Sequence, residues 1–193
     1  MSYFSKQYLN ELPSKNKKYN PKTIVADKSF ENIKNGDEYD IFISYSYPDK
    51  DFALIIYALL VEHGFSAYID LKDDSLNRNN VNGKTAKRLA KIMNESRSLI
   101  YVHTPSAKES RWCPWELGYM SAKRKFRCAV IPLIKNNEEF SSQEYLDLYP
   151  FVDYEIDGNT NKYVFWVKEY NSGKYIGLKE FVNGNSQWKD KEP

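Results

Sequence analysis

The sequence is poor in the residues from which several kinds of site are built. Its 193 residues include two cysteines, two histidines and eight glycines. Two cysteines without a Cys-x-x-Cys pair exclude a disulfide framework and a cysteine zinc site, and they fit a reducing cytoplasm. Two histidines disfavour a multi-histidine metal site. The glycine patterns of dinucleotide-binding and P-loop turns are absent, so we expect neither a bound metal nor a bound cofactor.

The chain also lacks a long apolar run and an excess of charge of one sign. Its longest apolar run, residues 52–61, is about half of the ~20 residues that a membrane-spanning helix needs. The first residues, Met-Ser-Tyr-Phe-Ser-Lys, contain no apolar segment of a secretory signal. A formal net charge of +2 is too balanced for a dedicated nucleic-acid binder. We therefore expect a globular, cytoplasmic protein that binds neither nucleic acid nor membranes.

Three parts of the chain differ in character. Residues 1–38 are polar and rich in lysine, and we expect them to form an N-terminal extension that packs on the core. Residues 39–183 hold the apolar segments and are predicted to form one domain. Residues 184–193 are predicted to be a polar tail.

Strand-like and helix-like segments alternate between residues 39 and 134. The expected strands are residues 39–45, 65–70, 99–103 and 129–134, and the expected helices are 52–63, 84–98 and 114–125. This order predicts an α/β fold with a central parallel sheet flanked by helices on both faces. Asp49 is predicted to cap the first of these helices. The segment 71–83 between the second strand and the next helix is expected to be a long loop, and residues 163–167 are a further strand candidate.

Ligands of such sheets bind beyond the carboxyl ends of the strands. Several polar and aromatic residues follow those ends, and we take them as candidate substrate-binding residues: Ser44, Tyr45, Ser46, Tyr47, Asp70 and Trp112. For the residues after the first strand, a role in the turn is an equal alternative. For Trp112, core packing is an equal alternative.

Three segments carry a resemblance to the Toll/interleukin-1 receptor (TIR) domain family, whose fold is flavodoxin-like. Tyr39-Asp-Ile-Phe-Ile-Ser-Tyr-Ser46 resembles the first TIR motif. Ser110-Arg-Trp-Cys-Pro-Trp-Glu-Leu117 resembles the motif in which a Trp-Cys pair precedes a glutamate four residues after the tryptophan. Phe126–Leu133 is similar to the strand that follows. The segment 71–83 departs from the family pattern, because it lacks the usual Arg-Asp…Pro-Gly residues.

A standalone chain of this length looks most like the TIR-like sensors of the bacterial Thoeris antiphage defence system. In catalytic TIR domains, the glutamate that aligns with Glu116 cleaves the N-glycosidic bond of NAD⁺. The resemblance implies an NAD⁺ nucleosidase and ADP-ribosyl cyclase, with NAD⁺ as substrate and Glu116 as the catalytic residue. Its cyclic ADP-ribose product would act as a signal to a separate NAD-degrading effector protein.

A single glutamate suits this chemistry. The nicotinamide of NAD⁺ is already cationic and leaves as a neutral molecule, so no general acid is needed. One carboxylate near the ribose can stabilise the developing oxocarbenium ion, whereas O-glycosidases need two. The structural alternative for Glu116 is a capping box, with Cys113 as the N-cap and Glu116 three residues later.

Other functions stay open at this point. The chain could be a non-catalytic scaffold that acts by TIR–TIR assembly, a simple NAD⁺ hydrolase, or a nucleoside deoxyribosyltransferase. Cys113 beside His103 could form a nucleophilic pair, although a packed cysteine is the commoner role. Residues 108–127 carry a net charge of +4 and residues 135–193 one of −4. These opposite charges suggest self-association into a homo-oligomer.

Overall fold

The computed structural model describes residues 5–27, 34, 36–73, 83–124, 127–133 and 144–190. Most of the predicted loop, residues 74–82, lies outside these ranges. In the described residues the chain forms one sheet with the strand order β2-β1-β3-β4-β5-β6-β7-β8. Its strands are β1 (Tyr39–Ser44), β2 (Ala67–Tyr68), β3 (Ser96–His103), β4 (Cys128–Pro132), β5 (Phe151–Asp157), β6 (Lys162–Lys168), β7 (Lys174–Gly177) and β8 (Lys189–Asp190).

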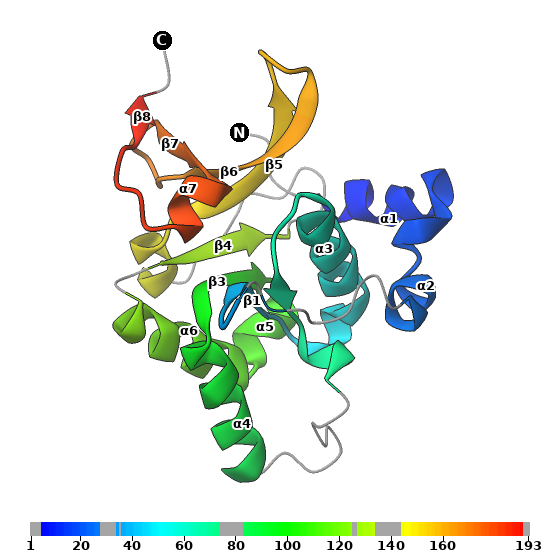
Figure 1. Ribbon diagram of the computed structural model, residues 1–193, viewed down its shortest axis with the longest axis vertical. Helices are drawn as coiled ribbons and strands as arrows, with labels where there is room; N and C mark the ends of the chain where they lie inside the picture. Colours follow the sequence, from blue (N-terminus) through cyan, green and yellow to red (C-terminus); the bar gives the residue numbers. More distant parts are fainter. Residues whose placement is uncertain are drawn as a thin grey trace.

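The sheet has a parallel half and an antiparallel half. Strands β2, β1, β3, β4 and β5 are parallel, which confirms the predicted α/β fold with a parallel sheet. Strands β5 to β8 are antiparallel neighbours, and their hairpins project from one end of the molecule (Figure 1). Of this half, the strand at 163–167 was predicted, and it lies within β6.

Helices cover both faces of the parallel half. They are α1 (Lys6–Lys15), α2 (Pro21–Ala26), α3 (Lys50–Glu62), α4 (Gly83–Asn94), α5 (Pro105–Glu109) and α6 (Trp112–Lys123), with the 3₁₀ turns η1 (Lys17–Tyr19), η3 (Tyr47–Asp49), η4 (Asp70–Lys72) and η5 (Glu144–Leu148). Helix α7 (Leu178–Val182) instead packs against β6 and β7. Helix α3 covers one face, and α4, α5 and α6 cover the other (Figure 1).

The two faces of the sheet bury alternate residues of the same strands. In β3, Ile100 and Val102 join the cluster under α3, whereas Leu99 and Tyr101 join the cluster under α4 and α6. Successive side chains of a strand point to opposite faces. Because both faces are covered, the middle of the strand, Leu99–Val102, is continuously apolar and shows no polar alternation in its sequence.

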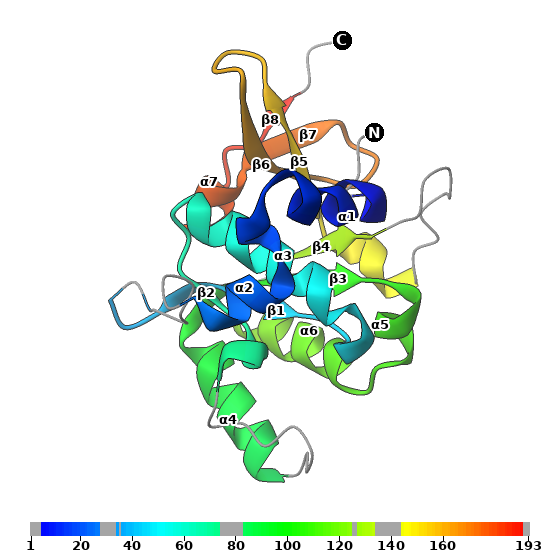
Figure 2. The ribbon, with the colours of Figure 1, turned by 90° about the vertical axis from the view of Figure 1, so that its right-hand side faces the viewer.

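The N-terminal helices complete the core on the α3 side. Helix α3 is buried along Ala53–Leu60 because it lies between the sheet and the pair α1 and α2 (Figure 2). Leu9, Leu12 and Ile24 of the N-terminal segment belong to the same hydrophobic cluster. At the other end of the chain, Lys189–Asp190 pair with β7. The division into residues 1–38, 39–183 and 184–193 stays a prediction.

Three local expectations were wrong. The predicted helix 84–98 ends at Asn94, and residues 96–98 already belong to β3. Asp49 precedes α3, but its side chain makes no capping hydrogen bond to that helix. Its carboxylate instead accepts a hydrogen bond from Thr104 Oγ1 at 2.5 Å and is buried. The predicted strand at 65–70 is regular only at Ala67–Tyr68, because Asp70 already begins η4. In the part of the chain that the structure describes, no helix has the length and apolarity to cross a membrane.

We expect Leu9→Ala to lower the free energy of unfolding by about 3 kcal/mol, because a fully buried leucine leaves a cavity when truncated. Urea denaturation followed by circular dichroism measures this loss. Leu148→Ala is the matched control, since Leu148 is 68% exposed and should change stability by less than about 0.5 kcal/mol. Equal stabilities of the two variants would show that the N-terminal helices do not contribute to the core.

Candidate active site

A buried carboxyl group lies at the carboxyl edge of the parallel strands. Glu116 of α6 is only 7% exposed, and its Oε2 accepts a hydrogen bond of 2.6 Å from Ser44 Oγ. Ser44 is the last residue of β1, the strand between β2 and β3. Burial raises the pKa of Glu116 to about 7, although the hydrogen bond from Ser44 lowers it. This carboxyl therefore changes its charge near neutral pH.

The helix that carries Glu116 begins earlier than the sequence predicted. Its N-cap is Arg111, so Glu116 is the fifth residue of α6. Ser110 Oγ accepts hydrogen bonds from the backbone N–H groups of Trp112 and Cys113, at 3.2 and 3.3 Å. The capping-box interpretation of Glu116 is therefore wrong. Its carboxyl group is directed to Ser44 rather than to the start of its own helix.

Asp70 and Tyr45 belong to the same cluster. Tyr45 Oη donates a hydrogen bond to Asp70 Oδ1, which joins the residue after β1 to the first residue of η4. The negative charge of Asp70 acts on Glu116 and contributes to its raised pKa. Four of the seven predicted site residues, Ser44, Tyr45, Asp70 and Glu116, thus interact at one edge of the sheet.

For the other three predicted residues, the contacts that the structure describes are with residues outside this cluster. Ser46 is buried and is the N-cap of η3, where its carbonyl oxygen accepts a hydrogen bond from the Asp49 N–H at 2.8 Å. Tyr47 is 60% exposed, and the ammonium of Lys50 lies 4.8 Å from its ring centroid. Trp112 packs edge-on against Trp115, with the ring centroids 5.5 Å apart. Trp112 is nevertheless one helical turn before Glu116, on the same side of α6.

Two buried neighbours of Glu116 are Tyr101, which was not predicted as a site residue, and Cys113, which the sequence offered only as a nucleophile beside His103. Tyr101 pairs with Ser44 in the register of β1 and β3 and is fully buried. Its hydroxyl has no hydrogen-bond partner among the described residues. Burial raises the pKa of this hydroxyl, and electrostatic interactions with several neighbours, Cys113 and Glu116 among them, raise it further. Cys113 lies on the same side of α6, where burial raises the pKa of its thiol and the electrostatic interaction with Glu116 raises it further. Only the register of two strands distant in sequence places Tyr101 here, so no local pattern could have found it.

The alternative pair Cys113 and His103 does not have the properties of a nucleophile and its base. Burial raises the pKa of the Cys113 thiol to about 11, so the thiolate is disfavoured at neutral pH. Burial also lowers the pKa of His103 to about 4. Both effects favour the uncharged groups of a packed core. Among the described residues, no group of three or more His, Cys, Asp or Glu side chains is placed to hold a metal ion.

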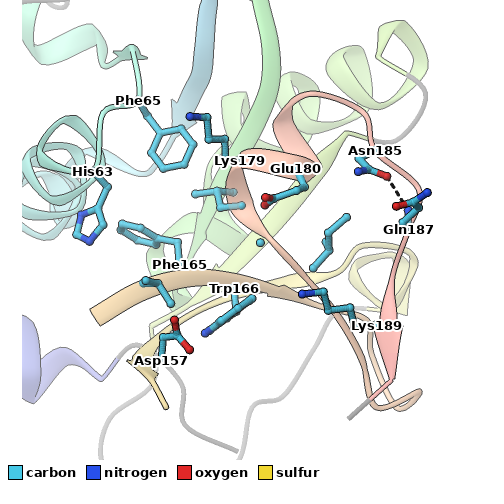
Figure 3. Close-up of a pocket in the computed structure, with 14 residues that line it drawn as sticks. His63, Phe65, Asp157, Phe165, Trp166, Lys179, Glu180, Asn185, Gln187 and Lys189 are labelled. Carbon is cyan, nitrogen blue, oxygen red and sulfur yellow. Dashed lines mark hydrogen bonds between the residues drawn. The ribbon is translucent and has the colours of Figure 1, made fainter. Parts of the chain in front are cut away.

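A cavity of about 420 Å³ lies elsewhere, between β6, β7, α7 and the segment that follows α3 (Figure 3). The rings of His63, Phe65 and Phe165 lie on one side, while Lys179 and Glu180 come from α7. None of the predicted site residues is among the described residues that line it. The candidate active site is therefore the buried cluster around Glu116 and not this cavity.

Comparison with known sequences gives one family and two relatives. The family model described as TIR domain matches residues 41–161. The chain is 28% identical over 164 residues to ThsB′ of Bacillus cereus (strain MSX-D12), named as a candidate 3′ cyclic ADP-D-ribose synthase, and the match covers 83% of this chain and 84% of that protein. It is 31% identical over 124 residues to TIR2 of Cytobacillus dafuensis, named as a candidate cyclic ADP-D-ribose synthase, with 57% of this chain and 33% of that protein covered.

Among solved structures, the TIR domain of a Toll-related receptor from Hydra magnipapillata matches with a TM-score of 0.45 and 17% identity. This match covers 56% of the chain and 78% of that domain.

We expect Glu116→Gln to stabilise the protein at pH 8 and to have little effect on stability at pH 5. Folding raises the pKa of Glu116 from 4.5 to about 7, so the folded state keeps a proton that the unfolded state has lost. Stability therefore falls as the pH rises between these values, by up to about 3 kcal/mol. Chemical denaturation at both pH values measures the difference. The exposed Glu109→Gln of α5 is the control, and a stabilisation of Glu116→Gln that does not depend on pH would contradict the linkage.

Proposed function

Since this chain belongs to the TIR-domain family, we propose that it is an enzyme that cleaves NAD⁺ between nicotinamide and ribose and cyclises the ADP-ribose. The observation that carries this proposal is the buried Glu116 carboxyl, which Ser44 holds at the carboxyl edge of the sheet. Two relatives named for the synthesis of cyclic ADP-ribose support the choice of reaction.

Glu116 is suited to stabilise the positive charge that develops on the ribose. The nicotinamide ring takes up the bonding electron pair and leaves uncharged, so the enzyme does not need to supply a proton. The carboxylate acts from a buried position, where its interaction with a cation is stronger than in water. The pyridinium of bound NAD⁺ favours the ionised form of Glu116, because an opposite charge nearby lowers the pKa of a carboxyl group.

The surrounding residues position the carboxylate and the substrate. Ser44 donates to one oxygen of Glu116 and leaves the other oxygen for the ribose. Asp70 and Tyr45 are joined by a hydrogen bond next to this group, and we assign them to the sugar hydroxyls. Ser46, Tyr47 and Trp112 extend the proposed binding surface along η3 and the first turn of α6, where aromatic rings can stack on the bases.

Cyclisation requires that the adenosine end of the dinucleotide reaches the anomeric carbon before water does. Holding the two ends of one molecule close together gives an effective concentration that can exceed that of water. The burial of Glu116 and Ser44 is consistent with limited access of water. In this proposal the cyclic product is the signal of a cytoplasmic antiphage defence, and a separate NAD-degrading effector protein receives it. Self-association into a homo-oligomer is part of the same proposal.

We expect the purified protein to release nicotinamide from NAD⁺ and to form a product lighter than ADP-ribose by one water. Glu116→Gln should lower this rate by at least about a hundredfold, as the loss of one preorganised charge-stabilising group does in other enzymes. Chromatography with mass detection, at low and high protein concentration, measures both products. ADP-ribose itself would indicate a simple hydrolase. Release that survives in Glu116→Gln would disprove the site, and no turnover together with concentration-dependent assembly would support a scaffold.

We expect kcat/KM for nicotinamide release to rise with pH through about 7, because the reaction needs the ionised Glu116. Ser44→Ala should move this midpoint to higher pH and lower kcat/KM at pH 7 several-fold, since the lost hydrogen bond stabilises the carboxylate. Ser121→Ala is the control, because Ser121 is a buried serine of α6, the helix that carries Glu116. An unchanged midpoint in Ser44→Ala would contradict the assigned role of Ser44.

A further inference from the structure

The N-terminal helices contact both loops that carry residues of the candidate site, the one after β1 and the one after β2. Helix α1 contacts the loop that follows β1. Lys6 Nζ lies 3.9 Å from Asp49 Oδ1 and 5.5 Å from the ring centroid of Phe52. Asp49 is the last residue of η3, and its other oxygen accepts from Thr104. The loop with Ser46 and Tyr47 is therefore tied to α1 on one side and to the end of β3 on the other.

Helix α2 contacts the loop that follows β2. The ammonium of Lys72, in η4, donates to the carbonyl oxygens of Ile24 at 2.9 Å, Val25 at 3.3 Å and Asp27 at 2.9 Å. The last carbonyl groups of a helix lack partners within the helix, and a cation at this end also interacts favourably with the helix dipole. Lys72 thus supplies the C-terminal cap of α2 from within the loop that contains Asp70.

The helices that hold these loops are themselves fixed. Leu9 and Ile24 are fully buried in the hydrophobic cluster that contains α3. The contacts from Lys6 and Lys72 therefore connect the site loops to the core rather than to a solvated tail. Loops at the carboxyl edge of a sheet are otherwise held less firmly than the strands that precede them.

We propose that α1 and α2 form a clamp on the active site, in which Lys72 positions Asp70 beside Glu116 and Lys6 positions η3 through Asp49. This inference rests on the proposed function. Lys72 and Lys6 are positioning residues, because they act through Asp70 and Asp49. The N-terminal extension is then a working part of the active site and not only an addition to the core.

The clamp has a consequence for the charge of Glu116. The titratable groups that interact with Glu116 are Asp70 from η4, Cys113 from α6 and Tyr101 from β3. Among them, Asp70 is the one that raises the pKa of Glu116 by its charge. Releasing η4 moves Asp70 from its place and so lowers the pH at which Glu116 ionises.

The test compares Lys72→Met, Lys72→Arg and Lys18→Met with the wild type. At pH 8.5, where Glu116 is ionised in every variant, Lys72→Met should lower kcat/KM about tenfold, mainly through KM, because Asp70 no longer meets the substrate. The midpoint of the pH dependence of kcat/KM should move to lower pH in Lys72→Met. Lys72→Arg should stay within about threefold of the wild type, because a guanidinium also donates to the three carbonyl groups.

Lys18→Met is the matched control. Lys18 joins the N-terminal segment to Glu62 at 2.8 Å, at the end of α3 opposite to η3. It should leave kcat/KM and the midpoint unchanged. A Lys72→Met enzyme with wild-type kcat/KM and midpoint would overturn the proposal, and so would equal losses in Lys72→Met and Lys18→Met. If Lys72→Met does not fold, as thermal denaturation would show, Lys6→Met serves in its place, with an expected loss of at least threefold.

A titration without turnover separates this inference from the proposed function. The carboxyl carbon of Glu116, assigned in ¹³C spectra by its absence in Glu116→Gln, should titrate at lower pH in Lys72→Met than in the wild type or Lys18→Met. An inactive wild type would disprove the proposed function, whereas the clamp would still be tested by this shift. Equal midpoints in all three proteins would disprove the clamp even if the enzyme is active.

Discussion

The hydrogen bond between Ser44 and Glu116 connects the end of a central strand to the helix that covers it, and the geometry of the site depends on it. The bond is possible because β1 lies between two parallel neighbours, so that Ser44 is held at the edge of the sheet. Helix α6 in turn is fixed by Leu117 and Met120, which are buried against the same face. A carboxyl group in this position has little contact with water, and its pKa rises accordingly.

Burying this carboxyl costs stability at neutral pH, and the rest of the fold offsets the cost. The α3 side of the sheet carries much of the apolar core, with α1 and α2 as a second layer over α3. The α6 side carries the polar groups Ser44 and Glu116 as well as the hydroxyl of Tyr101, which has no hydrogen-bond partner in the part of the chain that the structure describes. Such an arrangement is typical of functional sites, where local stability is given up for reactivity.

The N-terminal segment contributes both to the apolar core and to the position of the site loops. Its residues Leu9 and Leu12 pack in the same cluster as α3. It contacts both site loops, through Lys6 to Asp49 of η3 and through the carbonyl oxygens at the end of α2 that accept from Lys72 of η4. The antiparallel strands β5 to β8 extend the sheet at its other end. The cavity beside α7 belongs to that end and not to the cluster around Glu116.

The sequence by itself determined the order of strands and helices, because the segments between 39 and 134 have clear apolar patterns of strand and helix length. It also singled out Glu116, through the residues around Trp112 and Cys113. It did not predict β5 or the short α5, whose segments are short or mixed in polarity.

Only the tertiary structure decided which predicted residues meet. Ser44 and Glu116 are 72 positions apart, and Lys72 is 48 positions from Ile24. Local patterns carry no information on such contacts, because these depend on strand register and on how helices pack. The same reason explains why Glu116 was open to a capping role in the sequence, whereas in the folded chain its carboxyl group is directed to the end of β1.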